Sequence, residues 1–158
     1  MESPTEPPNF VLKIPPPAWA LAFVLVAMGI NNLFDWTFVA TIKSVPVAVI
    51  LAVGGLGLMG WGVWTFRQAG TEVMPTSPAI AKLVTDGPFR FTRNPMYGGL
   101  TLVTLSIALY VGTLPFFAVP VALFLLAHSV FIPFEEAKME RQYGQDFVDY
   151  KARVGRWF

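Results

Sequence analysis

The sequence contains no cysteine and few charged residues. Without cysteine the chain forms no disulfide framework, no thiolate metal site and no cysteine nucleophile, and we expect no metal site. Charged residues make up 13% of the chain and hydrophobic residues 54%, whereas a soluble domain usually carries about a quarter charged residues. The net charge of +1 argues against a nucleic-acid partner. This composition indicates a protein with too little polar surface to cover itself in water.

Two long stretches, between positions 44 and 67 and between positions 93 and 135, contain no Asp, Glu, Lys or Arg. Such long uncharged runs are rare outside a lipid bilayer. The second is too long for one helix, and Gly112-Thr113-Leu114-Pro115 near its middle is a turn signal. The first stretch predicts one membrane helix and the second predicts two. Together with an earlier apolar run, the sequence predicts four membrane helices, at residues 18–34, 45–66, 96–111 and 115–133. The predicted fold class is all-α, a polytopic membrane protein with a single domain over residues 1–158.

The basic residues predict how this protein is oriented in the membrane. Four helices would place residues 1–17, an irregular lead-in, on the same side as residues 67–95 and 135–158. These three segments hold every Lys and Arg of the chain except Lys43. Because cytoplasmic loops of membrane proteins are enriched in Lys and Arg, we expect both termini and the loop at 67–95 to be cytoplasmic.

The C-terminal tail changes from apolar to densely charged sequence. Tyr143, Phe147, Tyr150 and Val154 recur at spacings that place them on one helical face. Gly144 interrupts this pattern, so we expect a helix, a break and a second short helix on the cytoplasmic surface.

Residues Gly55 to Gly60 match the pattern G-x-G-x-x-G, the fingerprint of dinucleotide-binding proteins. That fingerprint works where a strand ends and a helix begins in water, so that backbone N–H groups hold a pyrophosphate. Here the pattern lies inside an uncharged membrane run. Glycines on a membrane helix more often allow close helix packing, and we favour that interpretation.

One polar cluster lies just before the third predicted membrane helix. Asn94-Pro95 is a typical helix start, and the free N–H groups of a helix N-terminus attract carboxylates and phosphates. A basic loop that anchors the protein to lipid headgroups would explain Arg90 and Arg93. It would not explain the sequence Asn-Pro-Met-Tyr-Gly-Gly at positions 94–99.

A second polar cluster, Glu135-Glu136, follows the fourth predicted membrane helix. Two adjacent carboxylates repel each other, and here they lie near the negative end of a helix dipole. A bound cation or a sulfonium-bearing ligand would offset that repulsion. His128 lies on the same helical face two turns earlier, and an ionisable group inside a membrane is a functional hypothesis by default. A histidine hydrogen-bonded between helices is the equally supported alternative.

Taken together, these motifs resemble the isoprenylcysteine carboxyl methyltransferase and phospholipid methyltransferase superfamily. The resemblance rests on Arg93-Asn94-Pro95-Met96-Tyr97-Gly98, one helical hairpin, Glu135-Glu136, and the tail Tyr143-Gly144…Tyr150…Val154…Arg156-Trp157. It covers roughly residues 70–157. Members are integral membrane enzymes that use S-adenosylmethionine. The resemblance therefore implies S-adenosylmethionine as cofactor and S-adenosylhomocysteine as product. It further implies a cofactor pocket formed by Leu83, Val84, Phe89, Arg93, Asn94, Pro95, Met96, Tyr97, Gly98, Glu135 and Glu136.

The sequence departs from this superfamily at two positions. Asn94 stands where a histidine is common. The carboxyl methyltransferases also place an arginine about one turn before the paired glutamates, where this chain has Phe131 or a neighbour. A prenylcysteine carboxylate is therefore not the substrate that we expect.

The resemblance implies transfer of a methyl group to a lipophilic acceptor that reaches the site from the bilayer, with membrane lipids as partners. An amine, thiol or hydroxyl acceptor would need a base, and His128 and Glu136 are the candidates. Two alternatives remain open at this point. One is a membrane-embedded NADPH-dependent reductase of sterol-like lipids, a group with a similar tail, and the other is a non-enzymatic scaffold or carrier.

Overall fold

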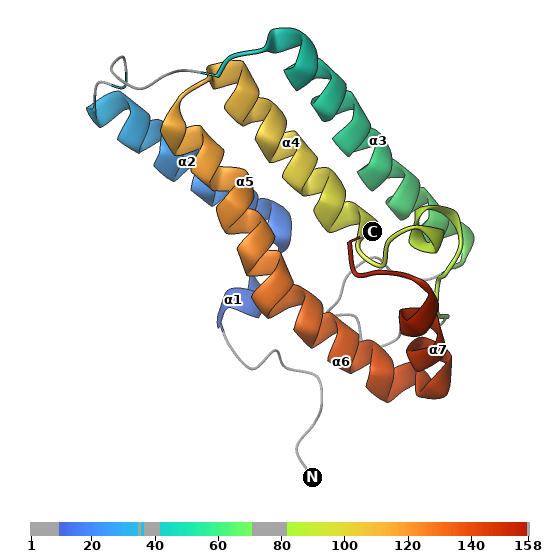
Figure 1. Cartoon of the computed structure of the whole chain (residues 1–158). Helices are drawn as coiled ribbons and strands as arrows, with labels where there is room; N and C mark the ends of the chain where they lie inside the picture. The colour runs from blue at the N-terminus through green and yellow to red at the C-terminus, as the bar shows by residue number, and fades with distance from the viewer. Residues whose placement is uncertain (1–9, 35, 37–41, 71–81, 158) are drawn as a thin grey trace.

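The computed structural model describes residues 10–34, 36, 42–70 and 82–157, and within these residues every regular element is a helix. Figure 1 shows the long helices running beside one another, with the C-terminal helices folded across one end of the bundle. The elements are α1 (Phe10–Lys13), α2 (Pro16–Leu33), α3 (Val45–Gln68), η1 (Gly87–Arg90), α4 (Pro95–Val111), α5 (Leu114–Leu126), η2 (Ala127–Phe131), α6 (Ile132–Tyr143) and α7 (Gln145–Arg153).

Three helices of the described chain are long and apolar enough to cross a membrane: α2, α3 and a continuous helix over Leu114–Tyr143. The helix α4 is apolar but shorter, with 17 residues. The expected all-α polytopic membrane fold is therefore confirmed, and the first three predicted helices begin and end within two residues of α2, α3 and α4. The fourth extends ten residues beyond its predicted end at Pro133, through the glutamate pair, because proline is tolerated where a helix continues from a widened turn.

That widened turn is the π-helical segment η2. The N–H of Ile132 donates to the carbonyl oxygen of Ala127, five residues earlier rather than four. The next residue, Pro133, has no N–H to donate, and in a regular α-helix its ring would clash with the carbonyl of Ser129. A single π turn relieves such a clash without ending the helix. As a result α5 and α6 form the one long helix seen in Figure 1.

The expected hairpin between α4 and α5 turns at Gly112. Its backbone is left-handed, with φ of 85°, and its N–H donates to the carbonyl oxygen of Ala108 at 2.7 Å. This is a common way for a helix to end, and glycine adopts it without steric cost. The hydroxyl of Thr113 then donates to the side-chain oxygen of Asn31 at 2.6 Å, which connects the hairpin to the end of α2.

The helices α3 and α4 form the most extensive helix pair of the described chain. A Cβ atom added to Gly55 would lie 2.6 Å from the backbone oxygen of Gly99, and one added to Gly99 would lie 2.6 Å from the oxygen of Gly55. The two backbones therefore touch directly. Gly55 is a packing glycine, as expected, whereas a Cβ added at Gly57 or Gly60 would meet no atom within 4 Å.

Replacing Gly55 by valine is expected to force α3 and α4 apart and to destabilise the protein by roughly 1–3 kcal/mol, the usual cost of overpacking. Gly57→Val is the matched control, because the same side chain there enters open space. Thermal unfolding of both variants in one detergent measures the difference. Equal melting temperatures would contradict the direct backbone contact.

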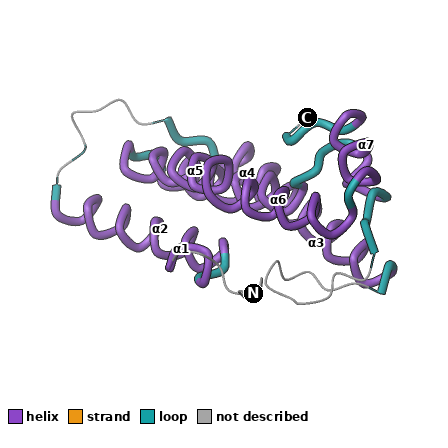
Figure 2. The backbone as a smooth tube through the Cα atoms, turned by 90° about the horizontal axis from the view of Figure 1, so that it is seen from below, coloured by secondary structure: helices purple, strands orange, loops and turns teal. Residues whose placement is uncertain are grey.

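The C-terminal tail forms the two helices that the sequence predicts, α6 and α7. They separate at Gly144, whose φ of 54° ends α6. Phe147 and Tyr150 of α7 are buried in one cluster with Phe66 and Phe89. Figure 2 shows α7 at the same end of the bundle as the end of α3. The tail therefore closes that end.

Candidate functional site

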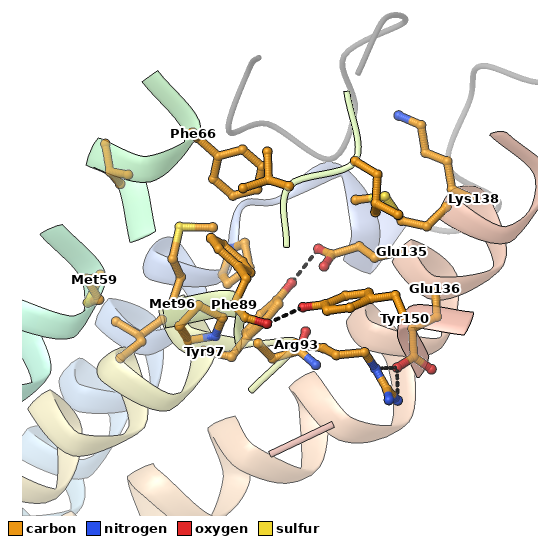
Figure 3. Close-up of a pocket in the computed structure, with 18 of the residues that line it drawn as sticks. Met59, Phe66, Phe89, Arg93, Met96, Tyr97, Glu135, Glu136, Lys138 and Tyr150 are labelled. Carbon is orange, nitrogen blue, oxygen red and sulfur yellow. Dashed lines mark hydrogen bonds and ion pairs between the residues drawn. The ribbon is translucent and has the colours of Figure 1, made fainter. Parts of the chain in front are cut away.

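A cavity of about 360 Å³ lies at this end of the bundle, and its walls are mainly apolar. That volume falls within the range of small-molecule sites. The walls come from the beginnings of α2 and α4, the second half of α3, the loop at 82–94, α6 and α7. Figure 3 shows aromatic and methionine side chains on one part of the wall and the glutamates with Arg93 on another.

The cavity brings together ten of the residues that the resemblance implies for the cofactor pocket. They lie on the loop, the first turn of α4 and the first turn of α6: Leu83, Val84, Phe89, Arg93, Asn94, Pro95, Met96, Tyr97, Glu135 and Glu136. Two sequence-predicted site residues, Gly98 and His128, are not among the residues that line it. A role in binding remains a prediction for all of them.

Aromatic contacts fix the loop before α4. The rings of Phe66 and Phe89 meet edge to face, with centroids 5.0 Å apart. The hydroxyl of Tyr150 donates to the carbonyl oxygen of Phe89 at 2.7 Å. Such pairs stabilise by about 0.5–1.5 kcal/mol beyond the area that they bury. The loop is thus held between α3 and α7, with its apolar side chains along the cavity.

One of the two glutamates is paired with a tyrosine. The hydroxyl of Tyr97, in the first turn of α4, donates to Glu135 Oε1 at 2.6 Å. Both side chains line the cavity, and Figure 3 shows them pointing toward each other. A hydrogen bond to a carboxylate is short and roughly twice as strong as a neutral one. It sets the position of Glu135 at the cavity wall.

The other glutamate is held by two arginines. Glu136 Oε1 accepts hydrogen bonds from Arg93 at 2.8 and 3.2 Å, and both of its oxygens accept from Arg156. The side chains of Arg93 and Glu136 are only 11% and 12% exposed. Arg93 and Arg156 thus already neutralise Glu136, and a cation or sulfonium-bearing ligand that offsets the charge of the pair remains a prediction for Glu135.

The last residues of the chain run along the loop before α4. We call residues 154–157 the C-terminal strap. Its carbonyl groups accept hydrogen bonds from three consecutive residues: the Arg93 N–H bonds to Gly155, and the side chains of Thr92 and Asn94 bond to Arg156, at 3.0–3.1 Å. The Arg93 guanidinium also donates to Val154. The amide of Asn94, which stands where the superfamily often has histidine, therefore connects the loop to the strap.

A model of the family Phospholipid methyltransferase matches residues 44–146. The chain belongs to this family. The matched region runs from the start of α3 into α7 and includes the Tyr97–Glu135 pair and Glu136. The protein is accordingly a membrane methyltransferase in general terms. Neither the search of curated proteins nor that of solved structures returned a match.

In this phospholipid methyltransferase family member, His128 lies on η2 and is exposed on the helix surface. Its Nδ1 atom accepts a hydrogen bond from Trp157 Nε1 at 3.2 Å. Of the two interpretations of this histidine, the geometry matches the hydrogen-bonded one, although the partner is the strap rather than a neighbouring helix.

Several residues that line the cavity were not expected as site residues. Tyr150 belongs to the helical face that the tail pattern predicts, so its burial could be anticipated but its place at the cavity could not. Met59 and Val63 come from α3, where an apolar run gives no sign of which face meets a cavity. Lys138 follows Glu135 by three residues, hence on the same side of α6, and this spacing was the available signal.

Tyr150→Phe is expected to lower the free energy of unfolding by roughly 1–2 kcal/mol, because the buried Phe89 carbonyl loses its donor. Burial raises the pKa of Tyr150 to about 12, with Arg93 acting in the opposite direction. A raised pKa of an acid means that the folded state binds this proton more tightly. Its contribution is therefore complete below pH about 10 and is lost as pH rises toward 12. Alkaline unfolding curves of both proteins check this, and identical loss between pH 10 and 12 would contradict it.

Proposed function

We propose that this protein transfers a methyl group from S-adenosylmethionine to a lipophilic acceptor that enters from the bilayer. The observation that carries the proposal is the cavity itself, where apolar walls meet the Tyr97–Glu135 pair at the first turn of α4. Membership of the Phospholipid methyltransferase family supports the same reaction type.

The residues at the cavity match the chemical parts of this cofactor. Phe66, Phe89 and the other apolar residues provide surface for an adenine ring. Glu135 provides a carboxylate for the ribose hydroxyls or the amino group. The free N–H groups at the start of α4 favour a carboxylate. When bound, the sulfonium supplies an electrophilic methyl group, and a neighbouring carboxylate favours its positive charge.

The walls suit methyl transfer because they are mainly apolar. An in-line displacement needs the nucleophile, the methyl carbon and the sulfur aligned, with water kept away. Met59, Val63, Met96 and Leu100 supply apolar surface from α3 and α4. Since these helices belong to the membrane-spanning part, an acceptor that reaches this wall is best drawn from the lipid phase.

The contacts distinguish among the candidate bases for an amine, thiol or hydroxyl acceptor. Both oxygens of Glu136 accept hydrogen bonds from Arg156, and Arg93 donates to one of them; such a carboxylate is a weak base. His128 is not among the residues lining the cavity. We therefore assign proton acceptance neither to Glu136 nor to His128.

The bias of Lys and Arg supports a cytoplasmic location for both termini and the cofactor side of the cavity. Lys82, Arg93 and Lys138 line the cavity, and all belong to segments that we expect in the cytoplasm. The cofactor would then enter from the cytoplasm and the acceptor from the bilayer.

A transfer assay with S-adenosylmethionine labelled on its methyl group tests the reaction. The purified protein is incubated with phospholipids, isoprenyl thiols and small lipophilic amines, and the lipid phase is counted. We expect label in at least one class and none with Glu135→Ala. Oxidation of NADPH by a sterol-like lipid, with no label transferred, would instead establish the reductase alternative.

A further inference from the structure

His128 and Trp157 contact each other outside the cavity. Trp157 is the last residue of the C-terminal strap. The indole N–H of Trp157 donates to His128 Nδ1 at 3.2 Å, and the centroids of the Trp157 and Phe124 rings are 4.6 Å apart. Phe124 and His128 are stacked, with an angle of 9° between their planes. Trp157 thus fits against one side of the long helix through both a hydrogen bond and ring contacts.

The π turn places His128 on the side of the helix that meets Trp157. The segment Ala127–Phe131 contains one residue more than a regular α turn would, which rotates the residues before it relative to Glu135 and Glu136. One helix thereby carries two different surfaces. Its cavity side bears the glutamates, and the side that meets Trp157 bears Phe124 and His128.

The strap connects these two surfaces. Immediately before Trp157, Arg156 pairs with Glu136, and its carbonyl accepts from Asn94. The backbone of Gly155 accepts from Arg93, the arginine that also pairs with Glu136. Arg93, Asn94 and Glu136 all line the cavity. A shift of the strap would therefore move three cavity residues together.

We propose that His128 and Trp157 are positioning residues, which fix the strap and through it hold Arg93, Asn94 and Glu136 in the arrangement that binds the cofactor. The inference rests on the proposed function in so far as the ligand is S-adenosylmethionine. It assigns the histidine a role without contact with the reacting atoms.

The test uses Trp157→Phe, which keeps a ring against Phe124 but removes the donor, and His128→Phe, which keeps the stacking but removes the acceptor. Each is expected to raise the Kd for S-adenosylhomocysteine about 3- to 10-fold, the loss of one hydrogen bond. The double variant is expected to match the single ones, because both remove the same bond. The KM for S-adenosylmethionine should rise with kcat nearly unchanged at saturation.

The matched control is Trp36→Phe. Trp36 follows the C-terminal end of α2, whereas the cavity lies at the beginning of α2, and its indole N–H donates to the Ile30 carbonyl. Removing this donor should leave the Kd unchanged. Limited trypsin digestion provides a readout that needs no cofactor. Cleavage after Arg153 and Arg156 should be faster in both strap variants than in the control.

Wild-type affinity and wild-type cleavage in both variants would overturn the inference, as would additive effects in the double variant. If the wild-type protein binds no S-adenosylhomocysteine, the proposed function fails instead. The digestion rates would then still decide whether the contact fixes the strap.

Discussion

Replacing Glu135 by alanine is expected to weaken the binding of S-adenosylhomocysteine by about 10- to 100-fold, the scale of a lost hydrogen bond to a charged group. The reason is its position. Glu135 lines the cavity and is held there by Tyr97 at 2.6 Å, whereas the oxygens of Glu136 are engaged by arginines. Removing Glu135 takes away the carboxylate that we assign to the ribose or amino group of the ligand.

Two further variants show whether the effect belongs to this carboxylate. Tyr97→Phe keeps the ring but no longer holds Glu135, so we expect an intermediate loss of affinity. Glu140→Ala is the charge-matched control, because Glu140 lies on α6 in an exposed ion pair with Lys151. Calorimetric titration in detergent measures all three. Undiminished binding by both Glu135→Ala and Tyr97→Phe would show that the cofactor binds elsewhere.

Replacing Glu136 by alanine is expected to cost stability rather than only affinity, by about 2 kcal/mol, because breaking a partly buried ion pair leaves the remaining charges uncompensated. Here two guanidinium groups, those of Arg93 and Arg156, lose their common carboxylate. The loop before α4 and the C-terminal strap both depend on this carboxylate. We therefore expect a lower melting temperature and faster digestion of the strap.

The exposed pair of Lys151 and Glu140 again supplies the control. Its side chains are 34% and 48% exposed, and exposed ion pairs typically contribute only about 0–1 kcal/mol. Glu140→Ala should therefore change the melting temperature little. If Glu136→Ala and Glu140→Ala were equally stable, the clustered charges at Glu136 would have no structural importance.

The membrane helices could be predicted from the sequence because their determinants are local. An uncharged run, a turn at Gly112 and a break at Gly144 are each visible within a few residues, and α3, α4 and α7 form where these signals place them. The fourth helix ran past its predicted end because Pro133 is accommodated by a π turn. Composition does not distinguish that outcome from a helix end.

The two glutamates show where local sequence information ends. Glu135 and Glu136 are adjacent and chemically identical in the sequence, yet one meets Tyr97 and the other meets Arg93 and Arg156. Tyr97 and Arg93 lie 38 and 43 positions before their partners and meet them across the hairpin of α4 and the long helix. Arg156 lies 20 positions after Glu136 and meets it only when the tail folds back. The same holds for His128, whose partner is 29 positions away.

Titration of the purified, full-length protein with S-adenosylhomocysteine, in parallel with NADPH, tests the central claim most directly. The cavity, its Tyr97–Glu135 pair and the family match lead us to expect saturable binding of S-adenosylhomocysteine and none of NADPH. Saturable binding of NADPH without binding of S-adenosylhomocysteine would contradict the assignment of this cavity to methyl transfer.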